Sequence, residues 1–197
     1  MAGKITGYLL AGGKNSRMGG EKKAFLQWEG KAFYERSREA LDFLEETVLS
    51  VEKEEPYLTT GMQLVKDRYP GCGPMGAICS GMDMLQTDAL LVVPCDVPKI
   101  QKESLRKLAA CYDETGSLVI IRTKDGLQPL LGLYPLHTKE VFQRHLREGH
   151  YRMQGILEEI PHLELQAEDE SCVNINTKSE YKQLTAERID KGELDEI

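Results

Sequence analysis

Short apolar segments alternate with amphipathic helical patterns along most of the 197-residue chain. Residues 89–93 are apolar throughout, which is typical of a strand buried on both faces of a sheet. Residues 103–112 instead repeat apolar side chains at helical spacing. Parallel strands are joined by crossover connections that are usually helices. The alternation therefore predicts an α/β fold, a doubly wound and mostly parallel sheet with helices on both faces.

The pattern also sets the expected element boundaries. Strands are predicted at residues 5–10, 47–51, 62–65, 89–93, 118–121, 130–134 and 163–166, with a short extended piece at 173–176. Helices are predicted at 31–44, 75–85, 103–112, 138–147, 153–159 and 179–189. No domain boundary is visible, so we expect one domain over residues 1–197, with a loosely ordered tail at 190–197.

The first predicted strand runs directly into a loop that combines glycines with cations. Glycine leaves backbone N–H groups free to turn toward a ligand, and successive N–H groups form a cradle for anions. The loop fits neither the P-loop pattern nor Gly-x-Gly-x-x-Gly. It predicts a phosphate site, most readily for a nucleoside triphosphate; the alternative is a flexible turn with solvated cations. The backbone donors are Leu10, Ala11, Gly12 and Gly13, and the cations are Lys14, Arg17, Lys22 and Lys23.

Asp96 lies just beyond the buried strand at residues 89–93, between Pro94 and Pro98, which stiffen the loop. In such sheets ligands bind at the carboxyl ends of the strands. Mg²⁺ takes oxygen ligands and needs only one or two carboxylates when substrate phosphates complete its shell. We therefore expect Asp96 to be a metal ligand. The alternative is a turn aspartate that accepts backbone N–H hydrogen bonds.

Asp67 follows the short strand near Val65 and precedes Gly73-Pro74, which suits a helix start because proline is favoured in the first turn. This segment is one of the places where the loops at the carboxyl ends of the strands converge, so Asp67 is a candidate for the binding crevice. The alternative is a surface turn in which Asp67 pairs with Arg68 or Lys66.

Composition excludes several classes of protein. The formal net charge is −7 and the pI is near 5.2, so binding of nucleic acid over a broad face is not expected. No apolar run approaches the ~18 residues of a membrane span, and the N-terminus lacks a signal-peptide pattern. The five cysteines form no Cys-x-x-Cys pair, which argues against a zinc site or a disulfide framework. We expect a cytoplasmic protein that acts on small molecules.

Four motifs in order resemble the molybdenum cofactor guanylyltransferase family of nucleotidyltransferases, from Thr6 to about Leu184. They match L-A-G-G-x-x-x-R-M-G from Leu10, followed by Lys22-Lys23, then Asp67 followed by Gly73-Pro74, P-C-D-x-P around Asp96, and V-N-x-N-T from Val173. The chain departs from the family in having Lys22-Lys23 where Asp-Lys is usual, and Gly-Pro-Met-Gly-Ala-Ile in place of Gly-Pro-Leu-Ala-Gly-Ile.

The resemblance implies roles for several residues. Lys23 falls on the family's phosphate-binding lysine, although Lys22 is adjacent, and Arg17 would share the phosphates. Asp96 falls on the Mg²⁺ ligand. Asp67 falls on an Asp of the family's nucleotide site, which makes it a candidate contact to the guanine or ribose, since a carboxylate can accept from both the N1–H and the exocyclic amine of guanine. Asn174 and Asn176 would contact molybdopterin, while Thr177 is also suited to cap the last helix.

The implied reaction transfers GMP from Mg·GTP to the terminal phosphate of molybdenum-bound molybdopterin, releasing pyrophosphate. Molybdopterin-delivery and molybdoenzyme-maturation proteins would be the protein partners. One alternative is a CTP-dependent cytidylyltransferase acting on molybdopterin or on a sugar or polyol phosphate. Another is a nucleotide-binding adaptor without turnover. Other chemistry is not expected: His145 and His150 lack metal-ligand spacing, and Cys95 should be a buried small apolar residue.

Overall fold

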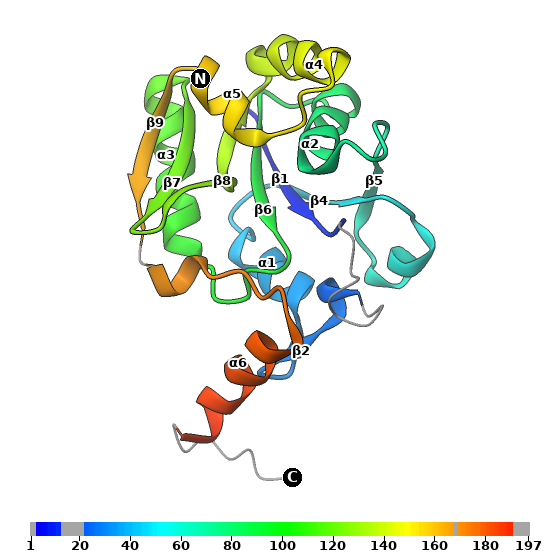
Figure 1. The fold of residues 1–197 in the computed structure, drawn as a ribbon, viewed down its shortest axis with the longest axis vertical. Helices are drawn as coiled ribbons and strands as arrows, with labels where there is room; N and C mark the ends of the chain where they lie inside the picture. The colour runs from blue at the N-terminus through cyan, green and yellow to red at the C-terminus, as the bar shows by residue number, and fades with distance from the viewer. Residues whose placement is uncertain (1–2, 13–21, 168, 191–197) are drawn as a thin grey trace.

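The computed structural model describes residues 3–12, 22–167 and 169–190. Within them a seven-stranded sheet has the order β5-β4-β1-β6-β8-β7-β9 (Figure 1). Neighbouring strands are parallel except where β8 meets β6 and β7. The strands are β1 (Ile5–Leu10), β4 (Glu46–Val51), β5 (Gln63–Lys66), β6 (Ala89–Pro94), β7 (Leu118–Thr123), β8 (Gly126–Pro135) and β9 (His162–Gln166). The predicted mostly parallel sheet is confirmed.

Helices cover both faces of the sheet. Alternate strand residues point to opposite faces, so β6 sends Leu91 and Val93 into one apolar cluster and Leu90 and Val92 into the other. The first cluster is covered by α1 (Phe33–Ala40) and α3 (Lys102–Thr115). The second is covered by α2 (Gly73–Met84), α4 (Lys139–Glu148) and α5 (Met153–Glu159). Every residue of β6 is buried, as its composition predicted.

β8 is the one strand of this sheet that runs against the others. It follows β7 through a two-residue connection that ends at Gly126, whose φ is +115°. A connection this short can only reverse the chain into an antiparallel hairpin, because a parallel pair needs a crossover. The strand was predicted to begin at residue 130, but it begins at Gly126.

The first predicted helix is shorter than residues 31–44. Lys31–Ala32 form strand β3 instead, paired with β2 (Gln27–Trp28). The Glu35 carboxylate accepts a hydrogen bond from the Ala32 N–H at 2.7 Å, which fixes the helix start at Phe33. The helix ends at Ala40, and residues 173–176 form no regular strand. These predicted boundaries were wrong.

The last helix, α6 (Lys178–Asp190), lies away from the sheet and beside the β2–β3 hairpin (Figure 1). Leu184 of α6 packs with Leu26, Phe33 and Ile175. The Tyr181 hydroxyl donates to the Gln27 carbonyl at 2.6 Å. This contact attaches the C-terminal segment to the chain that follows the glycine loop. Of the predicted tail, residues 191–197 lie outside the described part of the chain.

Two smaller points bear on the function classes discussed above. All five cysteines are free thiols. No helix in residues 3–12, 22–167 or 169–190 is long and apolar enough to cross a membrane.

The packing of α2 on β1 leaves no room at Gly81. A Cβ there would lie 2.7 Å from the Tyr8 ring and 2.9 Å from Leu90 Cδ1. The ring is fully buried, and its hydroxyl donates to the Ala77 carbonyl at 2.6 Å, so it cannot move aside. We expect Gly81→Ala to cost about 1–3 kcal/mol from overpacking, more than the ~1 kcal/mol that alanine gains in a helix. Chemical denaturation measures the difference.

Gly155→Ala in α5 is the matched control. Its Cβ would lie 3.1 Å from His145 Cε1, a contact that a small shift of the His145 ring relieves. It should change the unfolding free energy less than Gly81→Ala does. A Gly81→Ala protein as stable as the parent would contradict this account of the α2–β1 contact.

Candidate active site

A cavity of about 460 Å³ opens at the carboxyl ends of β1, β4, β5 and β6. This is the edge where the sequence predicted ligand binding. The walls come from three regions: the chain after β1, the ends of β4 and β5 with the start of α2, and the loop after β6. The lining residues are Leu10, Ala11, Gly12, Lys23, Ala24, Ser50, Val51, Glu52, Asp67, Gly71, Gly73, Pro74, Ala77, Pro94, Cys95, Asp96 and Leu130.

Lys23 joins three remote segments at one end of this cavity. Its Nζ donates to Asp96 Oδ2 at 3.0 Å and to Asn176 Oδ1 at 2.6 Å. The Lys23 and Asp96 side chains are 19% and 23% exposed, so the ion pair is only partly open to solvent. Residues from three of the four predicted motifs are thus in direct contact. The lysine that makes these contacts is Lys23, not its neighbour Lys22.

A short 3-10 helix, Lys23–Phe25, sets the position of Lys23. Phe25 stacks on Tyr57 with ring centroids 5.2 Å apart. The Tyr57 hydroxyl in turn donates to the Ala11 carbonyl at 2.9 Å. Tyr57 thereby links the start of the glycine loop to Lys23, a role that the sequence did not suggest because Tyr57 lies in none of the motifs.

The loop after β6 holds Asp96 through its backbone. The Cys95 N–H donates to the Leu10 carbonyl at 3.0 Å, and the Asp96 carbonyl accepts from the Ile175 N–H at 2.8 Å. The Asp96 side chain bonds to Lys23 rather than capping a turn. Cys95 is 2% exposed, as predicted for a small apolar residue, and burial raises the pKa of its thiol far above the usual range.

The Asp96 carboxylate fits a Mg²⁺ ligand. Its Oδ1 receives no hydrogen bond from any described residue, and Asp96 lines the cavity. One carboxylate suffices for Mg²⁺, which keeps waters and binds one or two carboxylates together with substrate phosphates.

Asp67 lines the wall formed by the ends of β4 and β5. Its N–H donates to the Val51 carbonyl at 2.9 Å. Its Oδ1 accepts from the Tyr69 N–H at 2.8 Å and from the Ser80 hydroxyl at 3.1 Å. Among the residues described, neither Lys66 nor Arg68 pairs with this carboxylate. The carboxylate is therefore held in place by neutral donors, and none of the described residues donates to Oδ2.

The glycine loop is described only at its start. Leu10, Ala11 and Gly12 line the cavity, and the Ala11 N–H donates to the Ser50 carbonyl at 3.0 Å. Gly13, Lys14 and Arg17 lie outside the described residues, so their predicted phosphate contacts stay predictions.

The two asparagines of the last motif differ in their surroundings. Asn176 contacts Lys23, whereas Asn174 is exposed and does not line the cavity. Thr177 caps α6 as predicted, accepting from the Glu180 N–H at 3.2 Å. Glu180 Oε2 accepts two hydrogen bonds, from the N–H groups of Asn176 at 2.6 Å and Thr177 at 2.9 Å. The sequence signal for Glu180 is the capping-box pattern Thr-x-x-Glu.

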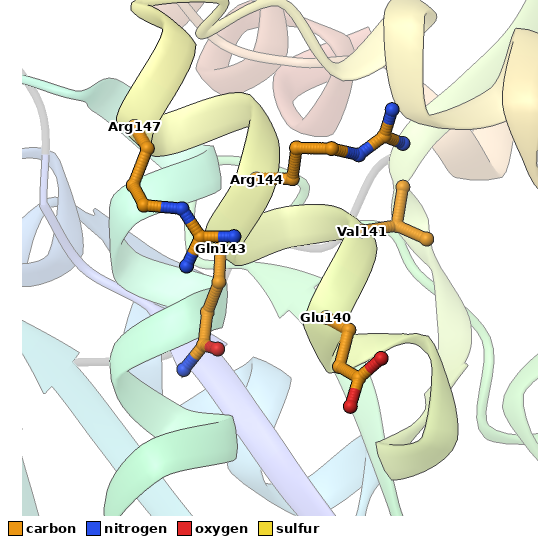
Figure 2. Close-up of a pocket in the computed structure, with 5 residues that line it drawn as sticks. All are labelled: Glu140, Val141, Gln143, Arg144 and Arg147. Atoms are coloured by element: carbon orange, nitrogen blue, oxygen red, sulfur yellow. The ribbon is translucent and has the colours of Figure 1, made fainter.

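A second, shallower hollow of about 400 Å³ runs along α4 (Figure 2). Its side chains all come from that one helix, and two of them are already paired: Gln143 donates to Asp83 and Arg144 to Glu159. Nearby, His145 Nε2 lies 3.0 Å from Glu159 Oε2. No residue predicted for the site lies here. The lining residues are Glu140, Val141, Gln143, Arg144 and Arg147.

Comparison with known proteins agrees with this geometry. Residues 7–165 match the family model described as the MobA-like NTP transferase domain. A Clostridium perfringens protein named probable molybdenum cofactor guanylyltransferase is 33% identical over 191 residues, covering 92% of this chain and 96% of that protein.

Two solved structures share the fold. The molybdopterin-guanine dinucleotide biosynthesis protein A of Archaeoglobus fulgidus aligns with a TM-score of 0.79 at 20% identity, over 94% of this chain and 99% of its own. The 4-diphosphocytidyl-2C-methyl-D-erythritol synthase of Anaerococcus prevotii aligns with a TM-score of 0.74 at 13% identity, over 93% and 95%.

The burial of Cys95 beside the cavity has a chemical consequence. We expect iodoacetamide at neutral pH to modify Cys95 at least about tenfold more slowly than Cys72 or Cys111, because each unit of thiol pKa changes the thiolate fraction tenfold. Cys72 and Cys111 are only partly buried. Mass spectrometry of timed samples measures the rates. In guanidinium chloride all should react alike, and fast labelling of Cys95 in the native protein would contradict the burial described above.

Proposed function

The chain belongs to the MobA-like NTP transferase family and is a nucleotidyltransferase of molybdenum cofactor biosynthesis, and from this we propose that it transfers GMP from Mg·GTP to the terminal phosphate of molybdopterin. The products are the guanine dinucleotide cofactor and pyrophosphate. The observation that carries the proposal is the ion pair between Lys23 and Asp96, which line one cavity together with the first residues of the glycine loop. A cation and a metal-binding carboxylate side by side suit a triphosphate.

The chemistry is an in-line displacement at the α-phosphorus. An oxygen of the acceptor phosphate forms a new bond to that phosphorus, the bond to the β-phosphate oxygen breaks, and the electron pair leaves with pyrophosphate. The attacking oxygen is already ionised at neutral pH, so no general base is needed. The main obstacle is repulsion between two anions, which fixed positive charge lowers.

The residues at the Lys23 end would supply that charge. The Lys23 ammonium has three N–H groups, and among the described residues two are used by Asp96 and Asn176. The third, with the backbone N–H groups of Gly12 and Gly13 and the Arg17 guanidinium, would hold the β- and γ-phosphates. The Ala11 N–H, also expected to do so, already donates to the Ser50 carbonyl. Mg²⁺ on Asp96, when bound, supplies charge neutralisation at the α-phosphate.

The opposite wall would hold the nucleoside. Asp67 is fixed by Tyr69 and Ser80 through one oxygen, which leaves the other to accept from a guanine N–H. Asn174 is exposed beside the site and is our candidate for the pterin contact. We also expect proteins that deliver molybdopterin and that mature molybdoenzymes to meet this side of the molecule.

The alternatives differ in their support. A structural neighbour with a cytidyl name shares the fold, so the fold alone does not distinguish GTP from CTP. The sequence relatives favour guanylyl transfer. An adaptor without turnover is disfavoured by membership of a transferase family.

Nucleotide selectivity tests the choice of substrate. With Mg²⁺ present, GTP at ~100 times its dissociation constant should stabilise the protein by about 2.7 kcal/mol, visible as a raised Tm, while CTP, ATP and UTP should not. Lys23→Ala should lose most of the GTP effect. Lys22→Ala is the matched control and should keep it. A shift with CTP alone would replace guanylyl by cytidylyl transfer, and a larger loss in Lys22→Ala would reassign the phosphate lysine.

The metal assignment is tested by turnover. We expect Asp96→Ala to lower kcat by ~10²-fold or more, a typical loss when a key electrostatic group is removed. The assay is pyrophosphate release from GTP with molybdenum-bound molybdopterin as acceptor. Asp125→Ala, in the exposed β7–β8 turn, is the control and should retain the parent rate. A near-normal rate in Asp96→Ala would remove Asp96 from the mechanism.

A further inference from the structure

Glu180 is the first acidic residue of α6 and belongs to none of the four motifs that resemble the family. Its carboxylate does more than cap a helix. One oxygen, Oε2, accepts both the Asn176 N–H at 2.6 Å and the Thr177 N–H at 2.9 Å. These two peptide groups flank the Cα of Asn176, the residue whose side chain contacts Lys23.

The segment before α6 is anchored on both sides of Asn176. On one side the Ile175 N–H donates to the Asp96 carbonyl at 2.8 Å, and the Ile175 side chain is buried against Leu26, Phe33 and Leu184. On the other side the Thr177 N–H donates to the Glu180 carboxylate at 2.9 Å. With the backbone fixed at both points, the Asn176 amide oxygen is held 2.6 Å from Lys23 Nζ.

Electrostatics agrees with this geometry. The hydrogen bond from the Asn176 N–H holds the pKa of Glu180 below its ordinary value, against the opposing effect of burial. The Thr177 donors and the nearby positive charge of Lys23 act in the same direction. Glu180 is therefore ionised where it meets the segment.

We propose that Glu180 is a positioning residue that holds Lys23 at the Asp96 end of the cavity, acting through the Asn176 backbone and side chain. The proposal rests on the proposed function of Lys23 as the phosphate lysine. In this arrangement α6, which lies outside the sheet, sets the position of the Lys23 ammonium that would bind a phosphate.

The first test needs no nucleotide. An N-hydroxysuccinimide acetate reagent acylates exposed amines, and the rate at Lys23 is read by mass spectrometry against Lys182, an exposed lysine on α6. We expect Glu180→Ala to raise the Lys23 rate relative to Lys182 by about three- to tenfold, the range that one intramolecular hydrogen bond controls. Glu180→Gln keeps a carbonyl oxygen for the two N–H groups and should label as the parent does.

Thr177→Ala is the matched control, because it removes the side-chain cap of α6 but leaves Glu180 on the Asn176 N–H. Its Lys23 labelling should not change. Equal acceleration in Thr177→Ala and Glu180→Ala would reduce Glu180 to a helix cap and overturn the proposal. So would acceleration in Glu180→Gln, since that variant preserves the hydrogen-bond geometry.

The second test measures Mg·GTP affinity by calorimetry. Glu180→Ala should weaken binding by about three- to tenfold in the parent and have no further effect in a Lys23→Ala background, because coupled residues are not additive. Additive losses would overturn the proposal. A parent protein that binds no GTP would instead contradict the proposed function, and the labelling result would still decide the role of Glu180.

Discussion

The ion pair between Lys23 and Asp96 is the contact on which the rest of the site depends. Each charge is about a fifth exposed, so removing one partner should cost more than the ~1 kcal/mol of a surface pair but less than the ~3–5 kcal/mol of a fully buried one. The position of the Lys23 ammonium is therefore set by the Asp96 carboxylate and the Asn176 amide oxygen. The third N–H of the ammonium is the one that we propose for a phosphate oxygen, so a nucleotide can bind without displacing Asp96.

The sheet explains why Asp96 lies where it does. β1 and β6 are adjacent and parallel, so the glycine loop and the Asp96 loop leave the same edge, and the Cys95 N–H closes the gap to Leu10. The reversed strand β8 does not disturb this edge, because it pairs on the far side of β6 and contributes only Leu130 to the cavity. The fold thereby fixes the carboxylate, while the lysine is fixed by side chains from other segments.

Local patterns in the sequence were enough for most strands of the seven-stranded sheet and for the position of Asp96 directly after β6, since both depend on neighbouring residues. β1 was predicted to the residue, and Cys95 was correctly placed inside. The contact between Lys23 and Asn176 joins residues 153 positions apart, which no local pattern encodes. The direction of β8 was missed because it depends on a two-residue turn, and the shorter α1 because a helical apolar pattern does not reveal the β2–β3 hairpin before it.

The match to the family model ends at residue 165, before the segment that carries Asn176 and Glu180. That segment nevertheless reaches the site at two points, through Ile175 to the Asp96 backbone and through Asn176 to Lys23. Its own position depends on α6 packing against the hairpin that follows the glycine loop. The lysine and the helix that holds it are thus attached to the same hairpin, so a shift of α6 would move both ends of the hydrogen-bonded chain together and preserve the distance between them.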